Sequence, residues 1–137
     1  MNVIGIGTDI TETVRIAQMI ERHGELFVDR VYTPHEVQYC SVRKAATQHY
    51  AGRWAAKEAV LKALGTGWAR GIRWRDVEVR NEIGGRPHIV LAGGALEVSR
   101  KLGIEQVLIS ISHCRAYATA YAIALGPSAP DRSEESL

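Results

Sequence analysis

Three side chains of this sequence could together carry out phosphoryl chemistry: Asp9, Glu58 and Lys62. Glu58 and Lys62 lie four residues apart in RWAAKEAVLKALGTG (residues 53–67), so in a helix they are neighbours one turn apart. Asp9 stands near the end of the apolar run NVIGIGTDI. Mg²⁺ is typically held by one or two carboxylates together with substrate phosphate oxygens. A metal held by Asp9 and Glu58, with the ammonium of Lys62, would neutralise charge on a transferred phosphoryl group.

Each of these residues also has a purely structural interpretation. A Glu four residues before a Lys favours an ion pair on a solvated helix, and Asp9 could simply cap a following helix. On a helical wheel, however, Trp54 and Leu61 flank the Glu58–Lys62 stripe on one side and alanines flank it on the other. A helix that is apolar in several directions is usually buried on several sides, so its charges need partners. The wheel alone favours a salt bridge and a functional site equally.

The elements that must position these residues begin with a buried strand at residues 2–10, which ends near Asp9. A helix follows, with apolar residues at helical spacing up to Gly24. Thr33 and Glu36 form a predicted capping box at the start of a second helix. The longest helix is predicted at residues 45–64, with Gly65 as its C-cap.

The second half of the chain predicts a hairpin of residues 75–81 and 86–92, turned at Gly84 and Gly85. A short helix at 95–102 and strands at 106–113 and 117–125 complete the pattern. This order predicts an α+β fold, a compact single domain with a mostly antiparallel sheet packed against the long helix. We expect the domain to span residues 1–126 and the polar tail 127–137 to be mobile.

The composition is that of an ordinary globular protein: 137 residues, 46% hydrophobic and 23% charged. No apolar run is long enough to span a bilayer, and the first residues lack the pattern of a secretory signal. The two cysteines, Cys40 and Cys114, agree with a reducing compartment. These features predict a cytoplasmic protein without a membrane partner.

A basic block surrounds Glu58. Between residues 43 and 75 Glu58 is the one acid, and the bases are Arg43, Lys44, Arg53, Lys57, Lys62, Arg70, Arg73 and Arg75. Such a block attracts phosphates, nucleic acid, anionic lipid or acidic proteins, and its field does not choose among them.

Two further features carry weaker signals. The GTG at residues 65–67 follows a helix and is therefore not a P-loop. The C-cap explains Gly65, although small residues at Gly65 and Thr66 could also bring backbone N–H groups close to a phosphate. His113 and Cys114 are adjacent in a strand pattern and would face opposite ways, which excludes a nucleophilic pair. On its own, His113 is more often a structural histidine.

Two long motifs give the chain a family resemblance. IGIGTDITETVRI and GRWAAKEAVLKALGTG resemble the two signatures of the holo-[acyl-carrier-protein] synthases, the short 4'-phosphopantetheinyl transferases. FVDRVYTPHE, GRP and ISISH are weaker similarities in the same order, and together they cover residues 1–126. The resemblance implies transfer of 4'-phosphopantetheine from coenzyme A to a serine of acyl carrier protein, in support of fatty acid biosynthesis. Adenosine 3',5'-bisphosphate is the other product.

The resemblance also implies roles for particular residues. Asp9 and Glu58 match the Mg²⁺ ligands, and Lys62 matches a lysine that contacts the transferred phosphate. The base for the serine hydroxyl is either Glu58 or a metal-bound water. Arg53 matches a position near the adenylate half of coenzyme A, and His113 a position near its 3'-phosphate.

Partners follow from the same resemblance. Arg15 matches an arginine that docks the acidic acyl carrier protein, and Arg22 is its neighbour on the outer side of the first helix. The family fold is a compact α+β protein assembled as a trimer, with coenzyme A between neighbouring subunits. One departure lies close to the site: Trp54 stands where phenylalanine is usual.

Three other functions would also use parts of these sequence features. The first is a related transferase that acts on carrier domains of polyketide or peptide synthases, which would use the same catalytic residues. The second is a basic, non-catalytic module that binds nucleotides or nucleic acid, which leaves Asp9 and Glu58 unexplained. The third is a metal-dependent nuclease, which two carboxylates and a lysine would also suit.

Overall fold

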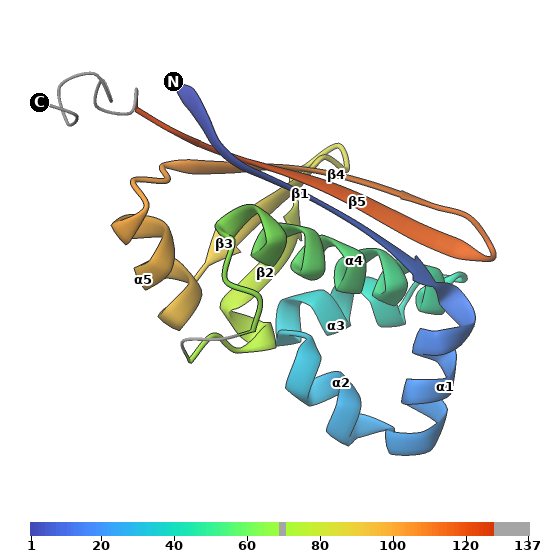
Figure 1. Cartoon of the computed structure of the whole chain (residues 1–137). Helices are drawn as coiled ribbons and strands as arrows, with labels where there is room; N and C mark the ends of the chain where they lie inside the picture. The colour runs from blue at the N-terminus through green and yellow to red at the C-terminus, as the bar shows by residue number, and fades with distance from the viewer. Residues whose placement is uncertain (69–70, 128–137) are drawn as a thin grey trace, which may run out of the picture.

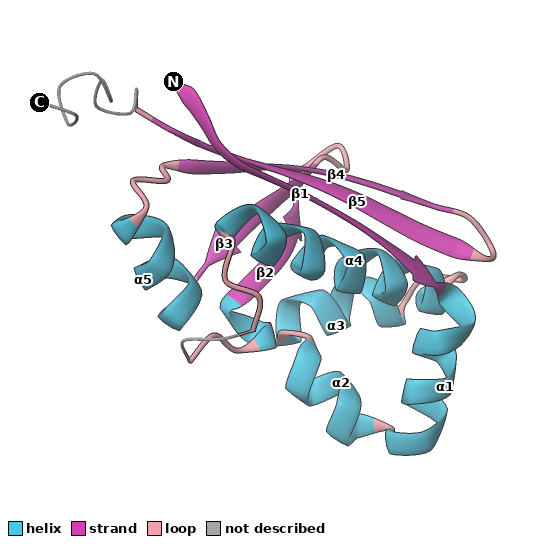
Figure 2. Ribbon diagram, in the orientation of Figure 1, coloured by secondary structure: helices cyan, strands magenta, loops and turns pink. Residues whose placement is uncertain are grey.

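The computed structural model describes residues 1–68 and 71–127. Three strands, β1 (Asn2–Glu12), β4 (Gln106–His113) and β5 (Tyr117–Gly126), form an antiparallel sheet in the order β1-β5-β4. The helices of the described chain all lie on one side of this sheet (Figures 1 and 2). They are α1 (Thr13–His23), α2 (Glu25–Val31), α3 (Pro34–Ser41), α4 (Ala46–Leu64) and α5 (Gly93–Lys101). None of these helices is both long and apolar enough to cross a membrane.

The predicted α+β fold is confirmed, with two differences. Helix α2 was not predicted, because its seven residues are too few to display a helical period, and Gly24 at a φ of 51° separates it from α1. The hairpin strands β2 (Val77–Asn81) and β3 (Pro87–Leu91) pair with each other in a second, two-stranded sheet. The predicted tail falls on residues 127–137, of which 128–137 lie outside the described residues.

Helix α4 packs against the inner face of the large sheet with very little space between the backbones. A Cβ built on Gly5 would lie 2.0 Å from the carbonyl oxygen of Ala63, and one on Gly7 would lie 1.9 Å from the carbonyl oxygen of Ala59. The middle strand, β5, has four buried alanines on the face that packs against α4: Ala118, Ala120, Ala122 and Ala124. Small residues on both elements therefore set the distance between β1 and α4.

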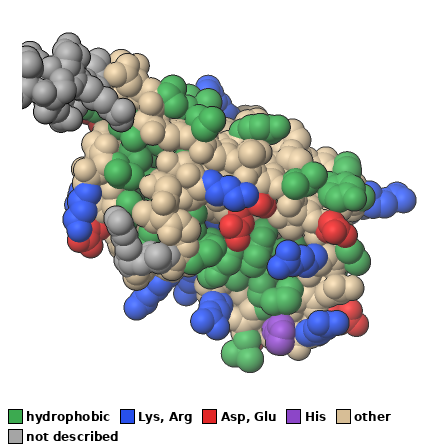
Figure 3. Space-filling model, in the orientation of Figure 1, with side chains coloured by type: hydrophobic (Ala, Val, Ile, Leu, Met, Phe, Trp, Pro, Cys, Tyr) green, Lys and Arg blue, Asp and Glu red, His purple; other side chains and the backbone are tan. Residues whose placement is uncertain are grey.

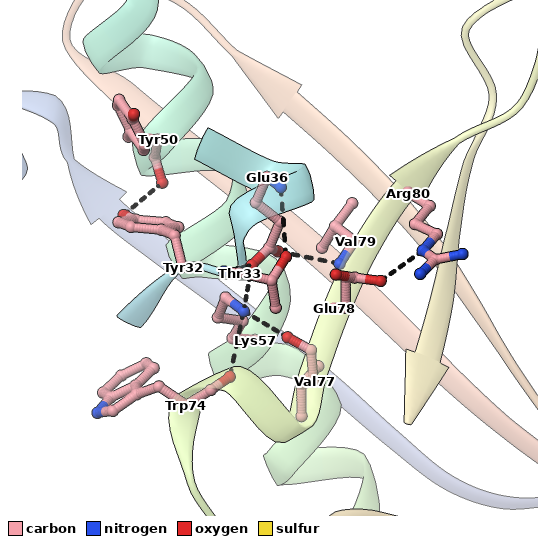
Figure 4. A network of polar contacts seen from close by, with 10 residues as sticks. All are labelled: Tyr32, Thr33, Glu36, Tyr50, Lys57, Trp74, Val77, Glu78, Val79 and Arg80. Atoms are coloured by element: carbon pink, nitrogen blue, oxygen red, sulfur yellow. Dashed lines mark hydrogen bonds and ion pairs between the residues drawn. The ribbon is translucent and has the colours of Figure 1, made fainter. Parts of the chain in front are cut away.

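A buried ion pair holds the other side of α4 (Figure 4). Lys57 and Glu36 are both fully buried, and Lys57 Nζ lies 2.8 Å from Glu36 Oε1. The ammonium also donates to the carbonyl oxygens of Trp74 and Val77, so three acceptors surround it. Burial lowers the pKa of Lys57, and the charge of Glu36 opposes that shift.

The Glu36 carboxylate also links the segments around it. It accepts the backbone N–H of Thr33 at 2.9 Å, which completes the predicted capping box, and the backbone N–H of Val79 at 2.9 Å. One carboxylate thus connects α3, α4 and β2, and its hydrogen bonds offset the cost of burying the charge.

The outer face of the large sheet carries exposed apolar side chains and no helix of the described chain. Ile6, Ile10 and Tyr121 expose 71, 66 and 61% of their surface. Along β1 and β5, such outward side chains alternate with inward glycines and alanines, as expected for a strand with two different faces. Exposed apolar patches on a protein surface commonly mark interaction sites.

The close contact between β1 and α4 predicts that Gly7→Ala is severely destabilising. The new Cβ would meet a backbone carbonyl that no side-chain rotation can move, so we expect a loss of about 3 kcal/mol or more in the free energy of unfolding. Urea denaturation measures it. Gly52→Ala within α4 is the matched control, because its Cβ would meet only a side-chain atom, the Cγ2 methyl group of Ile111, at 3.0 Å. Equal stability of the two variants would contradict this account.

Candidate active site

Asp9 lies on the inner face of β1, two residues beyond Gly7, and its side chain is only 15% exposed. The Thr11 hydroxyl donates to Asp9 Oδ2 at 2.7 Å. Lys62 Nζ lies 3.3 Å from Asp9 Oδ1 and donates to the carbonyl oxygen of Thr8 at 2.9 Å. The Asp9 carboxylate is therefore bound by Thr11 of the strand and by Lys62 of α4. It does not cap α1, whose N-cap is Glu12.

Glu58 is half-buried on α4 beside Asp9. Burial raises the pKa of the Glu58 carboxyl, and the negative charge of Asp9 raises it further. A hydrogen bond from Trp68, at 3.4 Å from indole Nε1 to Oε1, acts in the opposite direction, as do the positive charges of Lys62 and Arg15. The salt bridge between Lys62 and Asp9, together with the influence of both charges on Glu58, indicates that the predicted carboxylates and the lysine lie near one another.

The simple ion pair along the helix is not what the structure shows. Among the described residues, Lys62 makes its salt bridge with Asp9 on the strand, while Glu58 accepts a hydrogen bond from Trp68. Acidic and basic side chains lie side by side near the middle of the face shown in Figure 3. Lys62 keeps 55% of its side chain exposed, so its ammonium remains accessible to an anionic ligand.

The two carboxylates fit a hydrated, hard cation. Within residues 1–68 and 71–127 no group of three or more His, Cys, Asp and Glu side chains lies together, which excludes a closed zinc-type site in this part of the chain. Mg²⁺ needs only one or two carboxylates and takes its other ligands from water and phosphate. Asp9 and Glu58 could supply these carboxylates, and the Lys62 ammonium lies 3.3 Å from Asp9 Oδ1.

The predicted cofactor residues Arg53 and His113 lie apart from the carboxylates, around the first half of α4. Arg53 is almost fully buried, donates to Asn81 Oδ1 and places its guanidinium carbon 4.0 Å from the centre of the Tyr39 ring. His113 Nδ1 lies 3.0 Å from Gln48 Oε1.

His49 lies against His113 and within range of the Arg53 charge. Its ring lies 4.9 Å from that of His113, and burial followed by the charges of His113, Arg53 and Arg43 lowers the pKa of His49. A cleft of about 580 Å³ borders this basic region. It is lined by α3 and the hairpin turn, including His35, Tyr39, Arg43, Asn81 and Gly84.

Gly65 and Thr66 follow the last turn of α4. Gly65 is the αL C-cap with a φ of 77°, as predicted, and its N–H donates to the carbonyl oxygens of Leu61 at 3.0 Å and Lys62 at 3.1 Å. That N–H group is therefore engaged by the helix. The Thr66 hydroxyl donates to the carbonyl oxygen of Gly67 at 3.1 Å.

Arg15 and Arg22 are exposed on α1, seven residues apart and so on the same side of the helix. Arg15 is close enough to Glu58 to lower the pKa of that carboxyl. Arg22 lies in the last turn of α1.

The sequence interpretation missed Thr11 and Trp68. Thr11 lies two residues from Asp9 in the strand, a spacing that places both side chains on one face. The two-residue spacing in a predicted strand would therefore have been enough to place Thr11 beside Asp9. Trp68 lies ten residues from Glu58 beyond a turn whose path the sequence does not reveal.

Comparison with known proteins gives a consistent result. Residues 5–125 match the family model of the 4'-phosphopantetheinyl transferase superfamily. The holo-[acyl-carrier-protein] synthase of Koribacter versatilis is 46% identical over 121 residues, which cover 88% of this chain and 97% of that protein. The corresponding protein of Desulforudis audaxviator is 47% identical, with coverage of 95% and 98%.

Solved structures agree. The crystal structure of the synthase from Neisseria meningitidis has a TM-score of 0.83 and 29% identity, covering 90% of this chain and 99% of that one. The Helicobacter pylori synthase in complex with coenzyme A has a TM-score of 0.78 and 28% identity, with coverage of 88% and 99%. The chain therefore belongs to the 4'-phosphopantetheinyl transferase superfamily, among its holo-[acyl-carrier-protein] synthases.

Proposed function

We propose that Asp9, Glu58 and Lys62 form the centre at which this synthase moves 4'-phosphopantetheine from coenzyme A to a serine of apo acyl carrier protein. Adenosine 3',5'-bisphosphate is released. The observation that carries the proposal is the convergence of the three groups from β1 and α4. Membership of the family rules out the non-catalytic binding module. The relatives named for acyl carrier protein favour that acceptor over polyketide or peptide-synthase carriers.

Asp9 and Glu58 hold Mg²⁺ in this proposal. Bound there against the diphosphate of coenzyme A, the ion would neutralise negative charge that builds up on the transferred group. Thr11 keeps the Asp9 carboxylate in place through the bond to Oδ2, which leaves Oδ1 directed at Lys62. The lysine, whose side chain is already more than half exposed, then contacts the transferred phosphate with its ammonium. Either the Glu58 carboxylate or a water beside it accepts the serine proton.

The basic region around Arg53 and His113 would bind the other half of coenzyme A. Lys62 lies nine residues beyond Arg53, a separation of about 13 Å along a helix axis. An extended nucleotide would therefore lie along α4, with its 3'-phosphate near His113, its adenylate half near Arg53 and its diphosphate near Thr66 and Lys62. The cleft beside Tyr39 and Asn81 supports this orientation, because it opens next to Arg53.

Acyl carrier protein would dock on α1. Arg15 and Arg22 are both exposed, and Arg15 is near the catalytic carboxylates, so an acidic partner bound there brings its serine close to Glu58. The proposal also places the protein in the cytoplasm, in line with its cysteine content.

Association into a homotrimer would cover the outer face of the sheet. The exposed side chains of Ile6, Ile10 and Tyr121 supply the apolar surface that such an interface needs. Neighbouring subunits would then complete the walls around coenzyme A, which a single short domain leaves open.

The metal assignment predicts that Asp9→Asn and Glu58→Gln lose activity. Each change removes a negative ligand without altering side-chain size, so we expect turnover to fall about 100-fold or more. Mass spectrometry of apo acyl carrier protein after incubation with coenzyme A and Mg²⁺ measures the added group. Glu97→Gln on α5, where the carboxylate is 69% exposed, is the control. Near-normal turnover in both site variants would refute the metal assignment.

The docking surface predicts that Arg22→Glu weakens use of the carrier protein. Reversal of one rim charge should raise KM for acyl carrier protein roughly tenfold and reduce its salt dependence, while KM for coenzyme A stays unchanged. Steady-state kinetics at two salt concentrations provide the values. Arg100→Glu, also exposed but on α5, is the matched control. If both reversals act alike, α1 is not the docking surface.

The apolar sheet face predicts that Tyr121→Glu converts the protein to single chains. Burial of a carboxylate in the interface is costly, so light scattering coupled to gel filtration should show the molar mass fall from three chains to one. Circular dichroism checks that the variant is folded. Val42→Glu is the control, since Val42 is 77% exposed and follows α3. A wild-type protein with the mass of one chain would contradict the trimer.

A further inference from the structure

Trp68 reaches the catalytic centre from the turn that follows α4. We propose that it is a positioning residue for the cation site: its indole N–H fixes the direction of the Glu58 carboxylate, and an aromatic stack fixes the indole. The inference rests on the proposed role of Glu58 as a metal ligand, and it adds a residue that neither the motifs nor the chemistry of the carboxylates identifies.

The contact itself leaves room for a cation. Trp68 Nε1 lies 3.4 Å from Glu58 Oε1, and an indole nitrogen can only donate. The bond occupies one lone pair of Oε1, so Oε2 and the remaining lone pair stay available. Carboxylates that bind metals are commonly held by such outer hydrogen bonds, which orient them for the ion.

A neutral donor suits this place better than a charged one. Glu58 already interacts with the positive charges of Lys62 and Arg15. A third cation beside the carboxylate would oppose the binding of a divalent ion, because like charges repel at this range. The indole N–H orients the same oxygen and adds no net charge.

The chain path that delivers Trp68 depends on two glycines. Gly65 and Gly67 have φ values of 77° and 57°, which glycine adopts without strain. They turn the chain at the end of α4, and Trp68 lies back over the side of the helix that carries Glu58.

Stacked rings hold the indole at its back. The ring centre of Trp68 lies 3.6 Å from that of Trp74, and Trp74 lies 4.2 Å from Trp54 with an angle of 26° between the ring planes. Phe27 of α2 extends this aromatic cluster, with its ring centre 5.9 Å from that of Trp54 and the two rings tilted by 32°. Trp54 belongs to α4, one turn before Glu58. The stack therefore starts from the helix that carries the carboxylate, and large, stiff side chains keep the indole N–H over it.

Direct binding of Mn²⁺ to the free protein tests the inference without the reaction. Trp68→Phe keeps an aromatic ring in the stack but removes the donor, so the Kd for Mn²⁺, measured by electron paramagnetic resonance of the unbound ion, should rise about tenfold. Glu97→Gln on α5 is the control, since it neutralises an exposed carboxylate outside the site, and its Kd should stay within about twofold of the original.

The outcomes separate the inference from the proposed function. If Asp9→Asn abolishes Mn²⁺ binding while Trp68→Phe leaves Kd unchanged or lowers it, the metal site stands and the role of Trp68 is overturned. If Asp9→Asn and Glu58→Gln both bind Mn²⁺ normally, the proposed metal site is wrong and the inference fails with it.

A measurement on the unaltered protein covers the case in which Trp68→Phe does not fold. The indole N–H resonances of the tryptophans can be assigned with Trp54→Phe and Trp74→Phe. Saturating Mg²⁺ should shift the Trp68 resonance more than the other two. A Trp68 resonance that does not move would overturn the proposal.

Discussion

The backbone contact between β1 and α4 determines where the residues of the proposed active site can meet. Gly5 and Gly7 bring the strand so close to the carbonyl groups of Ala63 and Ala59 that no side chain fits between them. Asp9 follows on the same face of the strand and reaches Lys62 on the helix. The acid from the first strand and the two charged residues from the fourth helix can meet because the backbones touch. The signature glycines thus have a packing role, in addition to any contact with a ligand.

Helix α4 is packed against different elements on its two sides, and its charged residues Lys57 and Glu58 therefore have different surroundings. Lys57 points away from the large sheet, is fully buried, and finds Glu36 and two carbonyl groups there. Glu58, the next residue, lies near the edge of the sheet beside Asp9 and Trp68. Neighbours surround the helix, so each charge depends on the element it faces. Lys57 lies on the side of α4 that meets Glu36, and Glu58, about 100° further around the helix, lies on the side near Asp9 of β1.

Much of this fold could be predicted from helix caps and turns, which depend on residues close together in the sequence. The capping box at Thr33, the C-cap at Gly65 and the hairpin turn at Gly84 and Gly85 each involve a few adjacent residues, and all three are confirmed. Contacts between distant segments were not predictable in the same way. The partner of Lys57 lies 21 residues away in the chain, and the register of the hairpin gives no sign that it forms a second sheet. The meeting of Asp9 and Glu58 could be inferred because two carboxylates and a lysine suggest one chemistry. The arrival of Trp68 could not, since it depends on the path of a glycine turn.

The strand order imposes a sequence of events on the newly made chain. Strand β5 lies between β1 and β4 and pairs with both. Because Asn2 pairs with Gly126, β1 cannot complete its pairing until β5 has been made. During synthesis on the ribosome α4 is already complete while the alanine-rich strand that covers it is still missing. Its apolar sides are then exposed to water, and the nascent chain is open to aggregation until the final strand emerges.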